Sequence, residues 1–245
     1  MDNTQLIGLS RQAVLRRQID VIANNLANLN TAGFRAQYIR FSEYPMPGAE
    51  ATGLTGEDTA LSFVRDAGAL NDMATGSVRQ TGNPLDFALD GPGWFVINTD
   101  DGPRYSRNGA FRLDAGGNLV TADGRYVQSE SGNITFPAGE RDITIAADGT
   151  ISSSGGQKGR LRIVGFEDDL TLEREGENLF VGADPQPVET PSVVQGAIEQ
   201  SNVQAIQEIA DMVRVTRAYT SLAKLFSDAG ELQSDAINQL GQLDS

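Results

Sequence analysis

The sequence predicts an α+β fold, in which helices from the two ends of the chain pair as a coiled-coil domain and an antiparallel β domain is looped out between them. Three observations predict this arrangement. Residues 201–243 keep an apolar spacing of three and four, residues 3–28 repeat that spacing, and residues 83–187 change to a spacing of two. We therefore expect four segments: an N-terminal helix in 1–33, an extended connector in 34–80, a β domain in 81–190 and a C-terminal helix in 191–245.

The C-terminal segment carries two adjacent apolar rows, which together make an arc wider than one partner helix covers, so several neighbours are expected. Ser201 and Gln204 fit a capping box and predict that the helix begins at Ser201. Extended to Leu240 it would be roughly 60 Å long, more than a compact domain of this size can cover. The two rows are Val215, Ala218, Leu222, Leu225, Ala229, Leu232 and Ala236, and Ala205, Ile209, Met212, Thr216, Tyr219, Ala223 and Phe226.

The N-terminal helix offers a partner, because its apolar residues alternate spacings of four and three. An asparagine-rich end follows, for which two interpretations stay open. In the first, this end of the helix is frayed and closed by Gly33. In the second, one of the two residues Asn24 and Asn28 faces the seam between the helices and fixes its register. The residues that we expect at the helical assembly interface are Leu15, Ile19, Ile22, Asn24, Leu26, Asn28, Ile209, Met212, Tyr219, Leu222, Leu225, Phe226 and Leu232.

Short strands joined by tight turns are expected in the middle of the chain. Leu85, Phe87 and Leu89 alternate with polar or small residues, and the apolar run 94–97 follows a Gly-Pro-Gly break. Asp-Gly and Gly-Gly pairs favour hairpin turns, which indicates an antiparallel β domain. The turn pairs are Asp101-Gly102, Gly116-Gly117, Asp123-Gly124, Asp148-Gly149 and Gly155-Gly156.

Composition excludes several classes of function. The chain has no cysteine and no histidine, which removes thiolate nucleophiles, imidazole bases and the usual zinc ligands. The net charge of the chain is −14, and only residues 1–41 carry a net positive charge, with five Arg against two Asp. Five arginines spread over one helix are too few for a nucleic-acid interface. No run reaches the roughly 20 apolar residues of a membrane span. The charged residues of the N-terminus predict that it is not a cleavable secretory signal.

Four stretches carry a family resemblance. Residues 20–35 contain Ala23-Asn24-Asn25-Leu26-Ala27-Asn28 followed by Thr31-Ala32-Gly33-Phe34, and they resemble the N-terminal signature of the flagellar basal-body rod and hook family. The block 81–95, with Trp94 in place of the commoner phenylalanine, the block 105–111 and the segment 194–203 resemble further signatures of that family. Within the third of these signatures, we expect Arg107 to pair with an acid.

The resemblance implies a structural subunit of the bacterial flagellar basal-body rod. Such a subunit would polymerise with copies of itself and other rod subunits through its terminal helices, as part of the drive shaft that transmits torque. It would reach the periplasmic rod through the flagellar export apparatus, in unfolded form and without a cleaved signal peptide. Departures at Thr216, Thr220 and Leu222 favour a proximal-rod member over the distal-rod protein, which stays an alternative.

The sequence gives little support for an enzymatic function. Gly91-Pro92-Gly93 lacks the third glycine of a dinucleotide fingerprint. The acids between Glu167 and Glu177 lack EF-hand spacing and are expected to form a solvated loop. We therefore expect no catalytic residue, cofactor, metal, nucleic acid or small-molecule substrate. The remaining alternative is a secreted β-domain glycan-binding protein or enzyme that uses its helices only to oligomerise.

Overall fold

The computed structural model describes residues 3–46, 61–140, 142–176 and 178–243, which divide into two units. The helical unit comprises residues 1–26, 37–70 and 204–245, and the β unit comprises residues 27–36 and 71–203. Helices at both ends and a strand-rich middle confirm the α+β class. Within the described residues, neither helix has a stretch apolar and long enough to cross a lipid bilayer.

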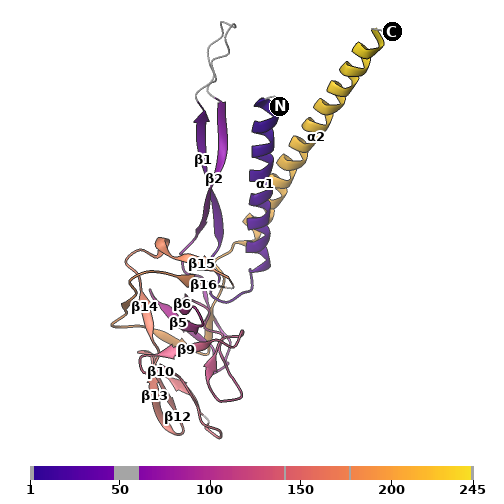
Figure 1. The fold of residues 1–245 in the computed structure, drawn as a ribbon. Helices are drawn as coiled ribbons and strands as arrows, with labels where there is room; N and C mark the ends of the chain where they lie inside the picture. Colours follow the sequence, from indigo (N-terminus) through magenta and orange to yellow (C-terminus); the bar gives the residue numbers. More distant parts are fainter. Residues whose placement is uncertain (1–2, 47–60, 141, 177, 244–245) are drawn as a thin grey trace. The chain divides into compact units, whose positions relative to one another are not determined.

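The helical unit contains helices α1 (Asn3–Ala27) and α2 (Ala205–Leu243), together with the two-stranded sheet of β1 (Gln37–Met46) and β2 (Leu61–Asn71) (Figure 1). The helices contact each other in an antiparallel sense. Gly8 of α1 lies against the ring of Phe226, and Asn25 near the other end of α1 reaches Glu208 in the first turns of α2.

One expectation about helix α2 needs correction. Helix α2 begins at Ala205 and not at Ser201. The segment 201–204 is held outside the helix, because the side chain of Asn202 accepts a hydrogen bond from the backbone N–H of Ala36 and donates to two backbone carbonyls. Within the expected connector, β1 and β2 are long strands that pair with each other.

The β unit is built from short antiparallel strands (Figure 1). Its ten-stranded sheet has the order β15-β16-β6-β5-β9-β8-β7, with β10 beside β9, and with β14 beside both β5 and β17. Smaller sheets pair β11 with β12 and β12 with β13, β18 with β4, and β19 with β3. The strands are β3 (Val78–Gln80), β4 (Phe87–Leu89), β5 (Trp94–Thr99), β6 (Gly102–Ser106), β7 (Arg112–Leu113), β8 (Leu119–Val120), β9 (Tyr126–Ser129), β10 (Gly132–Asn133), β11 (Thr144–Ile145), β12 (Thr150–Ser153), β13 (Gly156–Arg160), β14 (Ile163–Gly165), β15 (Glu173–Glu175), β16 (Leu179–Val181), β17 (Gln186–Pro187), β18 (Val193–Gln195) and β19 (Ala197–Glu199), with a short 3-10 helix, η1 (Asp169–Thr171), before β15.

The turn pairs of the sequence fall between consecutive antiparallel strands, as predicted. Asp101-Gly102 joins β5 to β6, and Asp148-Gly149 joins β11 to β12. The other three pairs join β7 to β8, β8 to β9 and β12 to β13. Local turn chemistry therefore specified the hairpins of the β unit.

Strand β5 separates two apolar cores. Successive side chains of a strand point to opposite faces, so Phe95 and Ile97 pack into one core with Phe87 and Phe111. On the other face Trp94 and Val96 pack with residues that include Tyr105, Val164 and Phe180. Burial on both faces explains why residues 94–97 form an uninterrupted apolar run.

Candidate functional site

A buried asparagine organises the helical unit. Asn25 is 1% exposed and pairs with both backbone groups of Gln37 at 2.9 Å, so its side-chain amide continues the hydrogen bonding of β1. The same Nδ2 donates to Oε1 of Glu208 at 3.0 Å. One amide therefore links α1, β1 and α2.

Glu208 is buried, and within the described part of the chain no basic side chain pairs with it. Burial raises the pKa of its carboxyl; the hydrogen bond from Asn25 acts in the opposite direction, and the nearby charge of Asp211 raises the pKa further. An acid in this environment favours its protonated form more than an exposed glutamate does.

Sequence reasoning named Asn24 and Asn28, but the fully buried amide is that of Asn25. Asn24 is exposed, and Asn28 accepts a hydrogen bond from the hydroxyl of Thr31 at 3.0 Å. The sequence did contain a signal for Asn25. This residue lies four positions after Val21 and three after Ile22, on the helix face of these two buried residues.

The residues expected at the helical interface differ in how far the chain itself covers them. On α1, Ile22 is buried, while Leu15, Ile19 and Leu26 are half-buried. On α2, the half-buried or buried positions repeat at spacings of four and three, and this inner row comprises Glu208, Met212, Val215, Tyr219, Leu222 and Phe226.

Other apolar residues of α2 are left uncovered. Leu225 is 65% exposed and Leu232 is 71% exposed, and Ile206, Ile209 and Val213 are exposed near the start of the helix. Together, these residues are called the outer row. Helix α1 adds exposed Leu9. Several large apolar side chains left exposed on one helix indicate a protein interaction surface.

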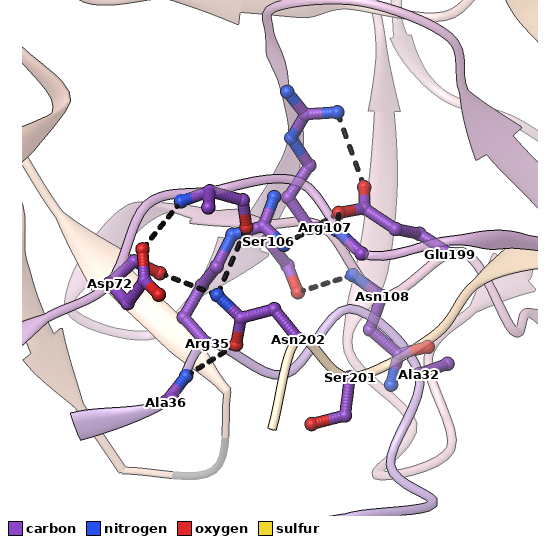
Figure 2. A network of polar contacts seen from close by, with 12 residues as sticks. Ala32, Arg35, Ala36, Asp72, Ser106, Arg107, Asn108, Glu199, Ser201 and Asn202 are labelled. Atoms are coloured by element: carbon purple, nitrogen blue, oxygen red, sulfur yellow. Dashed lines mark hydrogen bonds and ion pairs between the residues drawn. The ribbon is translucent and has the colours of Figure 1, made fainter. Parts of the chain in front are cut away.

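A buried ion cluster occupies the β unit. Glu199 accepts from Nη1 of Arg35 at 2.5 Å through Oε1, and from Nη1 of Arg107 at 3.3 Å through Oε2. Its Oε1 also accepts from the backbone N–H of Gly76 at 2.9 Å. Figure 2 shows Glu199 facing Arg107 in this network. The expectation that Arg107 pairs with an acid is thereby confirmed.

Trp94 lies close to both cations of this cluster. The guanidinium carbons of Arg35 and Arg107 lie 5.9 and 5.6 Å from the centroid of the indole, within cation–π range. The indole Nε1 donates to Asp169 at 3.2 Å. Burial lowers the pKa of Arg107, while Glu199 raises it and Arg35 lowers it further. One buried carboxylate thus serves two buried guanidinium groups.

A third arginine holds the N-terminal tract of the β unit. Arg174 of β15 lies over the rings of Phe34 and Phe180, and its Nη2 donates to the carbonyl of Arg35. Its Nε donates to Asn71 at 3.3 Å. Burial lowers the pKa of Arg174 to about 10, which keeps the side chain protonated at neutral pH.

Residues 27–36 are therefore an integral part of the β unit. Asn178 donates to the carbonyl of Ala32 at 2.8 Å, and the N–H of Gly33 donates to Glu199 O at 2.8 Å. Asn202 bridges Ala36 and Asp72, which Figure 2 also shows. Gly33 has φ of 66° and sits directly against the Arg107 backbone, where a Cβ would lie 2.3 Å from the carbonyl carbon.

These clusters bring distant sequence signatures together. Arg35 comes from the first signature, Trp94 from the second, Arg107 from the third and Glu199 from the fourth. The guanidinium and carboxylate groups bind each other, so their role is to hold the β unit together. Across the described residues, the acids form no group of three or more that could hold a metal ion.

Helices with uncovered apolar rows and a β unit closed by buried ion pairs define a structural assembly subunit. Three family models match the chain: "Flagella basal body rod protein" at residues 6–35, "Flagellar hook protein FlgE/F/G D1 domain" at 88–153, and "Flagellar basal body rod FlgEFG protein C-terminal" at 194–240. The chain is 35% identical over 248 residues to the flagellar basal-body rod protein FlgF of Caulobacter vibrioides, covering 99% of this chain and 100% of that protein. It belongs to the flagellar basal-body rod protein family.

Other relatives support the same family. The FlgF protein of Rhizobium meliloti is 34% identical over 242 residues, covering 96% of each chain. The FlgG protein of Agrobacterium fabrum is 35% identical over 241 residues, covering 88% of this chain and 91% of that protein. The chain is thus a FlgF-like structural subunit of the flagellar basal body that assembles with other rod components, and its family is not an enzyme family.

Proposed function

We propose that this chain is a proximal-rod subunit, which polymerises through its terminal helices and forms part of the shaft that transmits torque. The observation that carries the proposal is the outer row of α2. Leu225 and Leu232 are each more than 60% exposed, although fully burying a leucine side chain stabilises by about 1.5–3 kcal/mol. Neighbouring subunits that cover the outer row would supply this burial.

The inner and outer rows have different roles in this proposal. The inner row has the alternating spacing of a coiled-coil seam and faces α1 of the same subunit. The outer row contacts helices of copies of this chain and of other rod subunits. The expected interface residues Leu15, Ile19, Ile22, Met212, Tyr219, Leu222 and Phe226 then act by holding the helix pair, while Ile209, Leu225 and Leu232 contact neighbours.

The four-segment division, 1–33, 34–80, 81–190 and 191–245, is kept as a proposal about assembly. The two helices form the polymerising core, the connector contacts neighbouring subunits, and the β domain is carried outside the core. Export through the flagellar apparatus in unfolded form, without a cleaved signal peptide, would deliver the chain to the periplasmic rod, where neighbours order its ends.

Leu225→Asp tests the polymerisation surface. Because Leu225 is exposed, the substitution should change the stability of the isolated subunit by no more than about 0.5 kcal/mol. In the rod the carboxylate would be buried without a partner, at a cost of several kcal/mol. Basal bodies purified from a strain carrying only the variant should lack the subunit, and the cells should not swim. Leu222 is a poorer choice, since it is already half-buried within the chain.

The matched control is Ser227→Asp, which adds the same charge at an exposed position of α2 without removing an apolar side chain. This variant should incorporate and support swimming. Circular dichroism and Trp94 fluorescence establish that both variants are folded. Normal incorporation of Leu225→Asp would remove the outer row from the interface and with it the argument for polymerisation through α2.

A distal-rod role is the second candidate, because relatives named FlgG match almost as well as those named FlgF. Electron microscopy of purified basal bodies with a labelled subunit separates the two. Label at the base of the rod supports the proximal assignment, and label in the distal segment refutes it.

A further inference from the structure

A polar cleft opens in the β unit where three chain segments meet. Its cavity volume is about 330 Å³, within the range of small-ligand sites. Its walls are the end of β5 and the turn after it (Asn98 to Asp101), the segment Gly124 to Tyr126 at the start of β9, and Glu175 at the end of β15 with Gly176. Leu179 contributes to the lining and is itself buried.

The framework of this cleft is held by its own hydrogen bonds. Arg104 makes a two-point contact with Glu175 and also donates to the carbonyl of Asp101 at 3.2 Å. The hydrogen bond from Arg104 is the main reason that the pKa of Glu175 is lowered. The hydroxyl of Thr99 donates to Gly102 O at 2.7 Å. These contacts keep the turns in place without using the other polar groups of the lining.

Several hydrogen-bonding groups are consequently unused. Among the described residues, the side chains of Asn98, Asp100 and Arg125 make no hydrogen bond within the chain, although the charge of Arg125 interacts with Glu175. The carboxylate of Asp101 also accepts no hydrogen bond there, although its charge interacts with Arg104. Tyr126 lines the same cleft and is 37% exposed. The cleft thus combines an exposed aromatic side chain with polar side chains that can accept and donate hydrogen bonds.

We propose that this cleft binds a β-linked oligosaccharide. A hexose ring in such a chain has one apolar face of C–H groups, which packs on an exposed tyrosine, and pairs of neighbouring hydroxyls, which bind the two oxygens of a carboxylate or the two N–H groups of a guanidinium. Asp100 and Asp101 supply acceptors, Arg125 supplies donors, and Asn98 supplies both.

The charges and the geometry disfavour other small ligands. A phosphate-rich ligand would meet the carboxylates of Asp100 and Asp101 in a protein of net charge −14. Among the described residues, no group of three or more His, Cys, Asp or Glu side chains is placed to hold a metal ion. A neutral polyol can bind the hydrogen-bond acceptors and donors of the cleft together, and it has no charge that the carboxylates would repel.

The experiment is a titration of the full-length chain, labelled with ¹⁵N, with cellotriose and with triacetylchitotriose. The two sugars share their linkage and differ in the acetamido groups, so they show which substituents the cleft accepts. We expect a dissociation constant on the order of 1 mM or below for at least one of them, with shifted backbone resonances at Asp100, Arg125 and Gly176.

Substitutions then test the roles of the residues. Tyr126→Ala should weaken binding at least tenfold, and Tyr126→Phe, which keeps the ring, should weaken it less. Tyr38→Ala is the control, because Tyr38 is an exposed tyrosine in the helical unit and does not line the cleft, and it should leave the affinity unchanged.

Three results would overturn the proposal. The first is no shift with either sugar at about ten times the expected dissociation constant. The second is shifts confined to residues outside the cleft, or an affinity that Tyr126→Ala leaves unchanged. The third is loss of rod incorporation by Tyr126→Ala without any sugar binding, which would make the cleft a contact between subunits.

Discussion

Arg35 donates to the Glu199 carboxylate at 2.5 Å although the two residues are 164 positions apart in sequence. Both side chains are 1% exposed. Glu199 also carries Arg107, so removing its charge leaves two guanidinium groups buried without an anion. We expect Glu199→Gln to lower the free energy of unfolding by about 3–5 kcal/mol, as for one partner lost from a buried ion pair. Urea denaturation followed by the fluorescence of Trp94, the single tryptophan, measures the change.

Glu130→Gln is the control for this substitution. Glu130 pairs with Arg160 at 3.4 Å, and the side chain of Glu130 is 57% exposed while that of Arg160 is 31% exposed. Exposed pairs contribute about 0–1 kcal/mol, so this variant should unfold almost like the parent chain. Equal effects of the two substitutions would show that the buried cluster contributes no special stability.

Gly33→Ala should damage the β unit through backbone geometry. An L-residue at φ of 66° costs about 1–2 kcal/mol, and the new Cβ would overlap the backbone of Arg107, adding about 1–3 kcal/mol of overpacking. Gly82→Ala separates the two terms, since Gly82 has φ of 73° and open space around it. Urea denaturation should show a clearly larger loss at position 33. Similar losses would mean that the tract 27–36 moves away from Arg107 at little cost.

The buried carboxyl of Glu208 makes the stability of the helical unit depend on pH. Its pKa is raised by burial, so the stabilisation is complete below the ordinary glutamate pKa of about 4.3 and is lost as the pH rises through the folded-state pKa. Glu208→Gln keeps an oxygen that accepts from Asn25 and has no charge to desolvate. The variant should therefore be more stable than the parent at about pH 7, and the difference should vanish near pH 4.

Circular dichroism during urea denaturation at both pH values measures the difference. Glu231→Gln is the control, because Glu231 is exposed on the same helix, and it should show no gain at neutral pH. A destabilised Glu208→Gln variant at neutral pH would contradict the argument and would make the ionised carboxylate a required partner of Asn25.

Local patterns predicted much of this fold. The spacing of Leu15, Ile19 and Ile22 identified α1, and the turn pairs such as Asp101-Gly102 identified the hairpins. These signals work because each acts over a few residues. The start of α2 was missed because the fate of residues 201–204 depends on Asn202, whose side chain binds backbone groups 128 to 166 positions away.

The ion cluster could be predicted only in part. The motif around Arg107 indicated an acidic partner, but nothing near it in sequence identified Glu199, which is 92 positions away. Asn25 was likewise hidden among neighbouring asparagines, because its role depends on β1 and α2 together. The structural role of a charged or amide side chain depends on whether it is buried, and burial is set by tertiary packing rather than by local spacing.

Gly8→Ala tests the antiparallel contact between α1 and α2. A Cβ at Gly8 would lie 1.7 Å from Cζ of Phe226, so the helices must separate or the ring must turn, at about 1–3 kcal/mol. Gly230→Ala in α2 meets no atom within 4 Å, and it should stabilise the helix by about 0.5–1 kcal/mol. Phe226→Leu removes the crowding ring, so Gly8→Ala should cost less in that background. A double-mutant cycle from urea denaturation measures this coupling. Additive effects would show that α1 does not pack on Phe226 in solution, because only a shared contact makes the cost at Gly8 depend on the size of the side chain at position 226.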